Sequence, residues 1–171
     1  GEAACFDNVV AHDDIFGTLK PEWAKTRLEE EILRAARYSR PLSVALLQLV
    51  PHSEASVSTP ASSRAERVSA LQAVVRVARA ATQSLAVVAY VGGDQVLLIL
   101  PETVANQAQQ ITEALQSALE QEMYFLDQSA KTLGKPFREW GRLEAGRASM
   151  NGQAESAEGL LERAMSSIHY V

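Results

Sequence analysis

The 171-residue chain has little cysteine, few aromatic residues and no long apolar run. Its single cysteine, Cys5, cannot form an internal disulfide, so a reducing cytoplasmic location fits the sequence. Because no apolar run approaches the roughly 18 residues of a membrane span, we expect no membrane contact from this segment. The formal net charge is −5 and the chain has no basic stripe, which argues against nucleic acid as a partner.

The chain does contain enough apolar residues for the core of one domain. Hydrophobic residues make up 47% of the sequence and charged residues 22%, as in an ordinary globular protein. We interpret residues 1–13 as an N-terminal lead-in segment or linker stub. Residues 14–171 are then expected to form a single domain.

Hydrophobic periodicity predicts alternating helices and strands. Helices are expected from about Pro21, over 64–82, after about residue 103 and over 156–168, and strands over 42–50 and 143–148. The region 121–141 is expected to hold a short hairpin or loop. In the first helix, Trp23, Leu28, Ile32 and Ala35 lie at helical spacing, and we interpret Trp23 as a core anchor. This order predicts an α/β fold with a mixed central β-sheet flanked by helices.

The stretch from Ala86 to Leu100 is predicted to form two apolar strands joined by a Gly-Gly-Asp turn. Gly92 and Gly93 can adopt positive φ angles without steric cost, so they suit a tight hairpin. Asp94 places a carboxylate at the tip of that turn. The carboxylate could hold a metal ion and a phosphate, or it could simply be solvated.

The order and spacing of several motifs resemble the GGDEF family, the diguanylate cyclase domains of bacteria, over about residues 13–171. Gly92-Gly93-Asp94-Gln95-Val96 stands where that family has its Gly-Gly-Asp/Glu-Glu-Phe signature. The other matching segments are 14–19, 27–32, 36–43, 98–103 and 157–164. The resemblance implies a palm-like nucleotidyl-cyclase fold, with a Gly-Gly hairpin in the central sheet.

The resemblance also implies where catalytic groups should stand, and this sequence departs from that pattern. The family joins two GTP molecules into cyclic di-GMP, using metal ions held by carboxylates. The metal aspartate of the first strand falls at Gln48, a second aspartate at Val50, and the fourth signature position at Gln95. Neutral amides are weak Mg²⁺ ligands and cannot serve as charged bases. We therefore assign no catalytic residue and no metal ligand, except Asp94 if a nucleotide binds.

Many members of the family carry an inhibitory product site, Arg-x-x-Asp, shortly before the signature. The matching positions here are Gln83 and Ala86. Glutamine cannot replace the planar guanidinium fork that grips guanine or phosphate. Binding of cyclic di-GMP at this site is therefore not expected.

These departures favour a catalytically inactive, GGDEF-like signalling domain that acts through a protein partner or self-association. The loop 51–62 and the region 121–141 are candidate contact surfaces. The alternative is a domain that senses a guanine nucleotide, GTP or cyclic di-GMP, without turnover. Asp94 and one Mg²⁺ ion would then hold the nucleotide; otherwise no cofactor is expected.

Overall fold

The computed structural model describes residues 18, 20–52, 60–83, 85–125, 134–151, 153 and 155–168. The lead-in segment 1–13, its boundary with the domain, and much of the two candidate contact surfaces lie outside these residues. The described elements, in chain order, are α2 (Pro21–Arg37), β1 (Pro41–Pro51), α3 (Pro60–Thr82), β2 (Val87–Tyr90), β3 (Gln95–Pro101), α4 (Ala105–Gln121), β4 (Met123–Phe125), β5 (Gly134–Pro136), α5 (Phe137–Trp140), β6 (Gly141–Asn151) and α6 (Ala157–Ile168).

The central sheet has four strands in the order β2-β3-β1-β6, and each neighbouring pair is antiparallel. The α/β class is confirmed, but the expectation of a mixed sheet is wrong. After α3, strand β2 runs in the same direction as β1. The hairpin then reverses the chain, and β3 inserts between the two. β1 and β2, which run in the same direction, are therefore not neighbours, and the four described strands of this sheet form no parallel pair.

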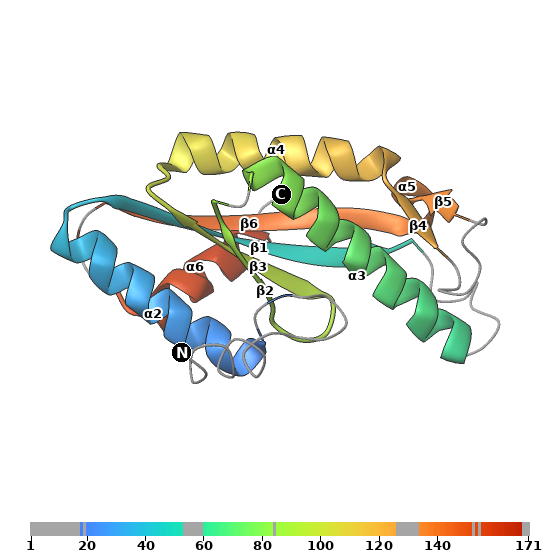
Figure 1. Cartoon of the computed structure of the whole chain (residues 1–171), viewed down its shortest axis with the longest axis horizontal. Coiled ribbons are helices and arrows are strands. Elements are labelled where there is room, and N and C mark those ends of the chain that lie inside the picture. The colour runs from blue at the N-terminus through green and yellow to red at the C-terminus, as the bar shows by residue number, and fades with distance from the viewer. Residues whose placement is uncertain are drawn as a thin grey trace, which may run out of the picture.

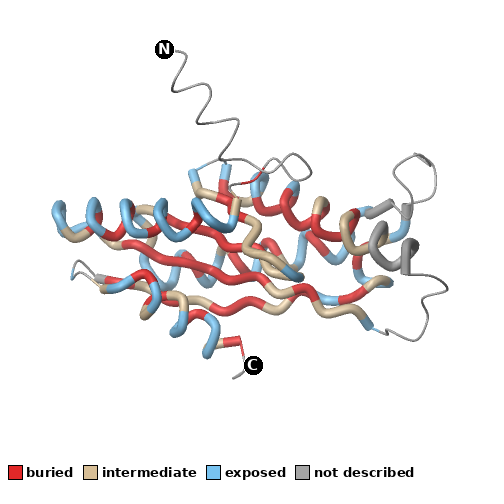
Figure 2. The backbone as a smooth tube through the Cα atoms, turned by 90° about the horizontal axis from the view of Figure 1, so that it is seen from below, coloured by how far each residue is buried: buried red, intermediate tan, exposed pale blue. Residues whose placement is uncertain are grey.

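Helices cover both faces of this sheet (Figure 1). Alternate residues of β1 point to opposite faces, as the pleat requires. Ala45, Leu47 and Leu49 pack with α3 and α4, while Val44 and Leu46 pack with α2 and α6. Figure 2 shows the strands buried between the two helical layers. The long apolar run of β1 is thus explained by its position at the centre of a doubly covered sheet.

Most predicted elements are confirmed, with shifted bounds. Helix α3 begins at Pro60 rather than near residue 64, and β6 spans Gly141–Asn151 rather than 143–148. The hairpin expected within 121–141 is formed by β4 and β5, which pair antiparallel. In the described part of the chain, no helix is both long enough and apolar enough to span a membrane.

The interpretation of Trp23 as a core anchor is wrong. Trp23 is 42% exposed, whereas its neighbour Ala24 is buried. The buried stripe of α2 runs through Ala24, Leu28, Ile32 and Ala35. Because successive residues of an α-helix are rotated by about 100°, Trp23 falls to one side of that stripe.

A glycine permits close packing of α6 on β6. A Cβ atom built on Gly146 would lie 1.9 Å from the carbonyl oxygen of Ala164 and 2.6 Å from Cγ1 of Ile168. Real Cβ contacts do not reach such distances, so any side chain here would push α6 away from the sheet.

We predict that Gly146→Ala lowers the free energy of unfolding by about 1–3 kcal/mol, because the added methyl group overpacks the interface between α6 and β6. Chemical denaturation followed by circular dichroism measures the loss. The control is Gly93→Ala, whose methyl group meets no atom within 4 Å but whose φ of +55° disfavours alanine. Gly93→Ala should lower the free energy of unfolding by about 1 kcal/mol. An unchanged stability of Gly146→Ala would contradict the close packing.

Candidate functional site

The Gly-Gly turn closes the hairpin between β2 and β3 as the sequence predicts. Gly92 and Gly93 have φ angles of +99° and +55°, a region that favours glycine. The Gln95 amide donates to the Gly92 carbonyl at 3.1 Å, and the Tyr90 hydroxyl donates to the Gly93 carbonyl at 2.9 Å. The Leu49 amide of β1 donates to the Asp94 carbonyl at 2.9 Å. The turn is therefore fixed against the neighbouring central strand.

The two glutamines at the substituted positions lie side by side. The antiparallel register pairs Gln48 of β1 with Gln95 of β3. The Nε2 atom of Gln95 donates a hydrogen bond of 2.8 Å to Oε1 of Gln48. The Nε2 atom of Gln48 donates to the Leu49 carbonyl at 3.2 Å. The two half-buried side-chain amides are thus joined by a hydrogen bond, and neither carries a charge.

Asp94 makes an ion pair with a residue that the sequence analysis did not single out. Nη1 of Arg67, on α3, lies 3.3 Å from Oδ2 of Asp94. The Asp94 side chain is 16% exposed, and its Oδ1 atom is buried without a hydrogen-bond partner. No sequence motif marks Arg67, because its ion pair with Asp94 joins α3 to a turn far along the chain.

Burial dominates the protonation equilibrium of Asp94. Removal from water raises the pKa of the Asp94 carboxyl above its ordinary value, because burial disfavours the charged form. The nearby Arg67 guanidinium lowers the pKa and offsets part of this effect. The carboxylate is therefore costly to ionise, and its one close counter-charge comes from the protein itself.

The last signature position, Val96, is buried in the core beneath α3 and α4. On the other side of β1, the register with β6 pairs Gln48 with Glu144. Nη2 of Arg142 holds the Glu144 carboxylate at 2.9 Å. The polar row that crosses the sheet here consists of Gln95, Gln48 and Glu144, and its carboxylate already has a cationic partner.

This donor set does not fit a pair of Mg²⁺ ions. Magnesium is held in proteins mainly by carboxylates and by substrate phosphates, and it keeps several water ligands. Gln48 and Gln95 carry amides that are hydrogen-bonded to each other, and the Asp94 carboxylate is paired with the Arg67 guanidinium. The described residues hold no cluster of three or more His, Cys, Asp or Glu side chains that could bind a metal ion.

Gln83 and Ala86, the positions that the resemblance aligns with an inhibitory product site, lie between the end of α3 and the start of β2. Gln83 is exposed, has a φ angle of +52° and follows the last residue of α3. Ala86 is partly buried and packs against the core beneath α3 and α4. Neither residue carries a charged group.

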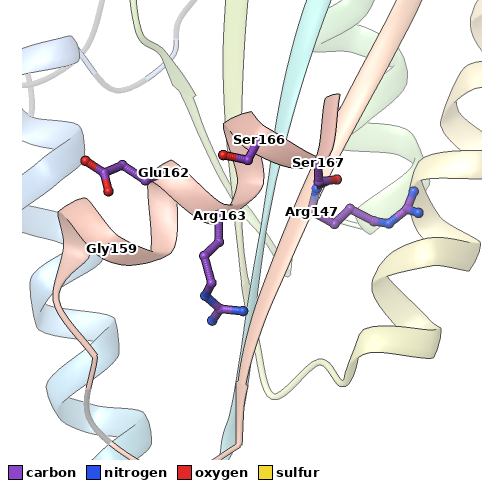
Figure 3. A pocket seen from close by; sticks show the side chains of 6 residues that line it. All are labelled: Arg147, Gly159, Glu162, Arg163, Ser166 and Ser167. Atoms are coloured by element: carbon purple, nitrogen blue, oxygen red, sulfur yellow. Dashed lines mark hydrogen bonds between the residues drawn. The ribbon is translucent and has the colours of Figure 1, made fainter. Parts of the chain in front are cut away.

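A concavity beside α6 does not form a convergent site. Its arginines, Arg147 and Arg163, point in different directions (Figure 3). Arg147 donates to the Thr112 hydroxyl at 2.7 Å, and Arg163 donates to the Ser149 carbonyl at 2.9 Å. The Ser167 hydroxyl accepts from the Arg147 amide at 3.1 Å. The side chains of Arg163 and Ser167 thus occupy two backbone groups of β6, an edge strand, which helps to protect that strand from pairing.

No protein-family model and no curated protein matches the chain.

Solved structures do match it. The GGDEF domain of FimX from Pseudomonas aeruginosa superposes with a TM-score of 0.74 at 15% identity, over 94% of this chain and 92% of that one. The coiled coil and GGDEF domain of DgcB from Caulobacter crescentus, in complex with c-di-GMP, gives 0.79 at 14% identity, over 98% and 83%. Diguanylate cyclase SiaD from Pseudomonas aeruginosa, in complex with its activator SiaC, gives 0.75 at 15% identity, over 99% and 60%.

These identities are too low to transfer an activity, but the coverage and the TM-scores are high. The likeness inferred from the motifs is therefore confirmed as a likeness of fold: this chain has the fold of a GGDEF domain.

Proposed function

We propose that this chain is a degenerate member of the GGDEF family that works as a non-catalytic signalling domain. In this proposal it keeps the family scaffold, has lost cyclase activity, and acts by contact with a protein partner or a second copy. A cytoplasmic location belongs to the same proposal. Cyclic di-GMP is not expected to bind at the positions of Gln83 and Ala86.

The hydrogen bond between Gln48 and Gln95 carries this proposal. The residues stand where the resemblance places a metal carboxylate and the charged fourth signature position. A metal-assisted phosphoryl transfer needs negative oxygens that converge on the cations. Each lost tenfold in rate corresponds to about 1.4 kcal/mol of transition-state stabilisation, so loss of two charges is expected to cost many orders of magnitude.

The ion pair between Arg67 and Asp94 supports the same conclusion from a different residue. A divalent cation at Asp94 would have to displace the guanidinium or bind beside it, against charge repulsion. A protein partner is also known for one protein with a similar fold, because diguanylate cyclase SiaD was solved in complex with its activator SiaC.

One observation, an unsatisfied oxygen of Asp94, favours the alternative that the domain binds a guanine nucleotide without turnover. Oδ1 of Asp94 is buried and accepts no hydrogen bond in the described structure. An unsatisfied buried acceptor costs about 1–3 kcal/mol, so a cation or a donor that reached it would gain stability. Mg²⁺ with GTP is the group that this alternative places there.

We predict that the wild-type protein forms no cyclic di-GMP from GTP and Mg²⁺, because the carboxylates needed to hold the metal ions are absent. Chromatography of the nucleotides after prolonged incubation provides the measurement. Calorimetry with GTP, with and without Mg²⁺, tests the nucleotide-sensing alternative in the same samples. Product that disappears in Asp94→Ala would refute the proposed loss of activity.

Restoring the charges should create a metal response that the wild type lacks. In Gln48→Asp/Gln95→Glu, carboxylates replace the bonded amides, so repulsion lowers the melting temperature in chelator and Mg²⁺ raises it again. The control is Gln110→Glu/Gln121→Glu, which makes the same charge change at two exposed positions. Equal responses of the two variants to Mg²⁺ would contradict a convergence of these positions.

The raised pKa of Asp94 predicts a pH-dependent effect of Asp94→Asn. Since the folded state binds the Asp94 proton more tightly than the unfolded state, this group's stabilising contribution is lost as pH rises through the folded pKa. Asparagine does not ionise, so the variant should gain stability relative to wild type between about pH 3 and about pH 7. Urea denaturation across this range measures the trend, and the exposed change Glu120→Gln serves as the comparison variant. If the variant instead lost stability relative to wild type as pH rises, the attraction of Arg67 would outweigh burial in setting the pKa of Asp94.

A further inference from the structure

The two edge strands of the central sheet differ in length and in charge. β2 has four residues and no charged side chain, whereas β6 has eleven residues and carries Arg142, Glu144 and Arg147. The outer backbone groups of an edge strand can pair with a strand from another chain, and a short edge strand offers few of them. A further strand would therefore gain the most hydrogen bonds at β6.

Alternate residues of β6 direct their backbone groups away from β1. In an antiparallel pair, every second residue bonds to the partner strand, and the residues between them face outward. The Arg147 amide donates to Oγ of Ser167 at 3.1 Å. Nη2 of Arg163 donates to the Ser149 carbonyl at 2.9 Å, and both of these side chains belong to α6 (Figure 3). The odd-numbered residues within 143–149 are therefore the outward ones.

A third outward group is bonded from the opposite face of the sheet. Nε2 of Gln116, on α4, donates to the Leu143 carbonyl at 2.8 Å. On the same side, Nη1 of Arg147 donates to Oγ1 of Thr112 at 2.7 Å, which ties the middle of β6 to α4. Because α4 and α6 cover opposite faces of the sheet, side chains reach this edge from both helical layers.

The spacing of the bonded groups interrupts the outward row. An added strand would bond to every second residue of β6, and thus to consecutive members of this row. Ala145 lies between the bonded Leu143 carbonyl and the bonded Arg147 amide. Any two consecutive members within 143–149 therefore include a group that a side chain already bonds. A strand held at one residue alone would gain too little, because the net gain of a hydrogen bond over water is small.

Arg163 is itself held in position by Glu155, which precedes α6. Nε of Arg163 lies 2.9 Å from Oε1 of Glu155, and Nη2 lies 2.6 Å from Oε2. A guanidinium bound through two of its nitrogens to one carboxylate has a fixed orientation. The same Nη2 atom bonds the Ser149 carbonyl, so Glu155 keeps Arg163 directed at the edge of the sheet.

We propose that Gln116, Arg163 and Ser167 guard the edge of the sheet at β6 against the addition of a strand, above all the β6 strand of a second copy. Two identical edge strands can pair antiparallel about a two-fold axis, so every copy of the chain is a competitor for this edge. The inference does not rest on the proposed function. It adds that a partner binds through other surfaces than an extension of the sheet at β6.

The triple variant Gln116→Ala/Arg163→Ala/Ser167→Ala tests the guard, because it frees the three bonded groups. Sedimentation velocity compares it with the wild type between about 10 μM and about 1 mM. We expect the triple variant to self-associate at about tenfold lower concentration, since the freed groups gain partners in a second copy. Loss of Arg163 removes a positive charge from a chain of net charge −5, so charge repulsion opposes this association.

The matched control is Gln110→Ala/Glu162→Ala/Ser166→Ala. It truncates three exposed side chains of the same two helices, α4 and α6, which make none of the three hydrogen bonds to β6. The control should associate as the wild type does. Circular dichroism confirms that each variant is folded.

Two further measurements locate the association at β6. Adding Arg147→Pro to the triple variant deletes an outward N–H group, which an edge strand tolerates and an added strand cannot use. This change should return association to the wild-type level. In the triple variant itself, hydrogen exchange of the Ala145 amide should slow as the concentration rises, because that N–H group then bonds the added strand.

A triple variant that associates no more than the wild type would overturn the inference. Association that leaves exchange at Ala145 unchanged would overturn it as well, because the contact would then lie elsewhere. Neither result would affect the proposed loss of activity, which the GTP assay decides separately.

Discussion

The candidate site depends on the antiparallel register between β1 and β3. This register brings Gln48 opposite Gln95, and the Leu49–Asp94 backbone hydrogen bond fixes the turn against the central strand. A shift by one residue would send every side chain of one strand to the other face and would disrupt both cores. The apolar residues on both faces of β1 therefore hold the two amides together. Core packing therefore fixes which positions meet at the site, independently of the side chains that stand there.

Charge balance at the turn follows from burial. A carboxylate that is mostly removed from water needs a counter-charge or a proton. In a metal-dependent site, cations supply that charge. Here Arg67 reaches Asp94 from α3, and the other two positions have no charge to compensate. The result is a nearly neutral turn on a fold that this chain shares with solved diguanylate cyclase structures.

The same scaffold leaves part of α2 exposed, and the reason is geometric. The helix covers the sheet with one narrow stripe, so a large side chain next to that stripe remains at the surface. Trp23 is such a residue.

The sequence by itself determined the helices, the central strand, the Gly-Gly turn and the neutral side chains at Gln48 and Gln95. These are local properties, since periodicity, glycine conformations and residue chemistry can be read without knowing what packs where. Only the tertiary structure decided the antiparallel sheet, the ion pair of Asp94 and the exposure of Trp23. Each depends on contacts between segments far apart in the chain. Periodicity locates an apolar stripe only to within about one residue, and for Trp23 a rotation of about 100° separates the core from the surface.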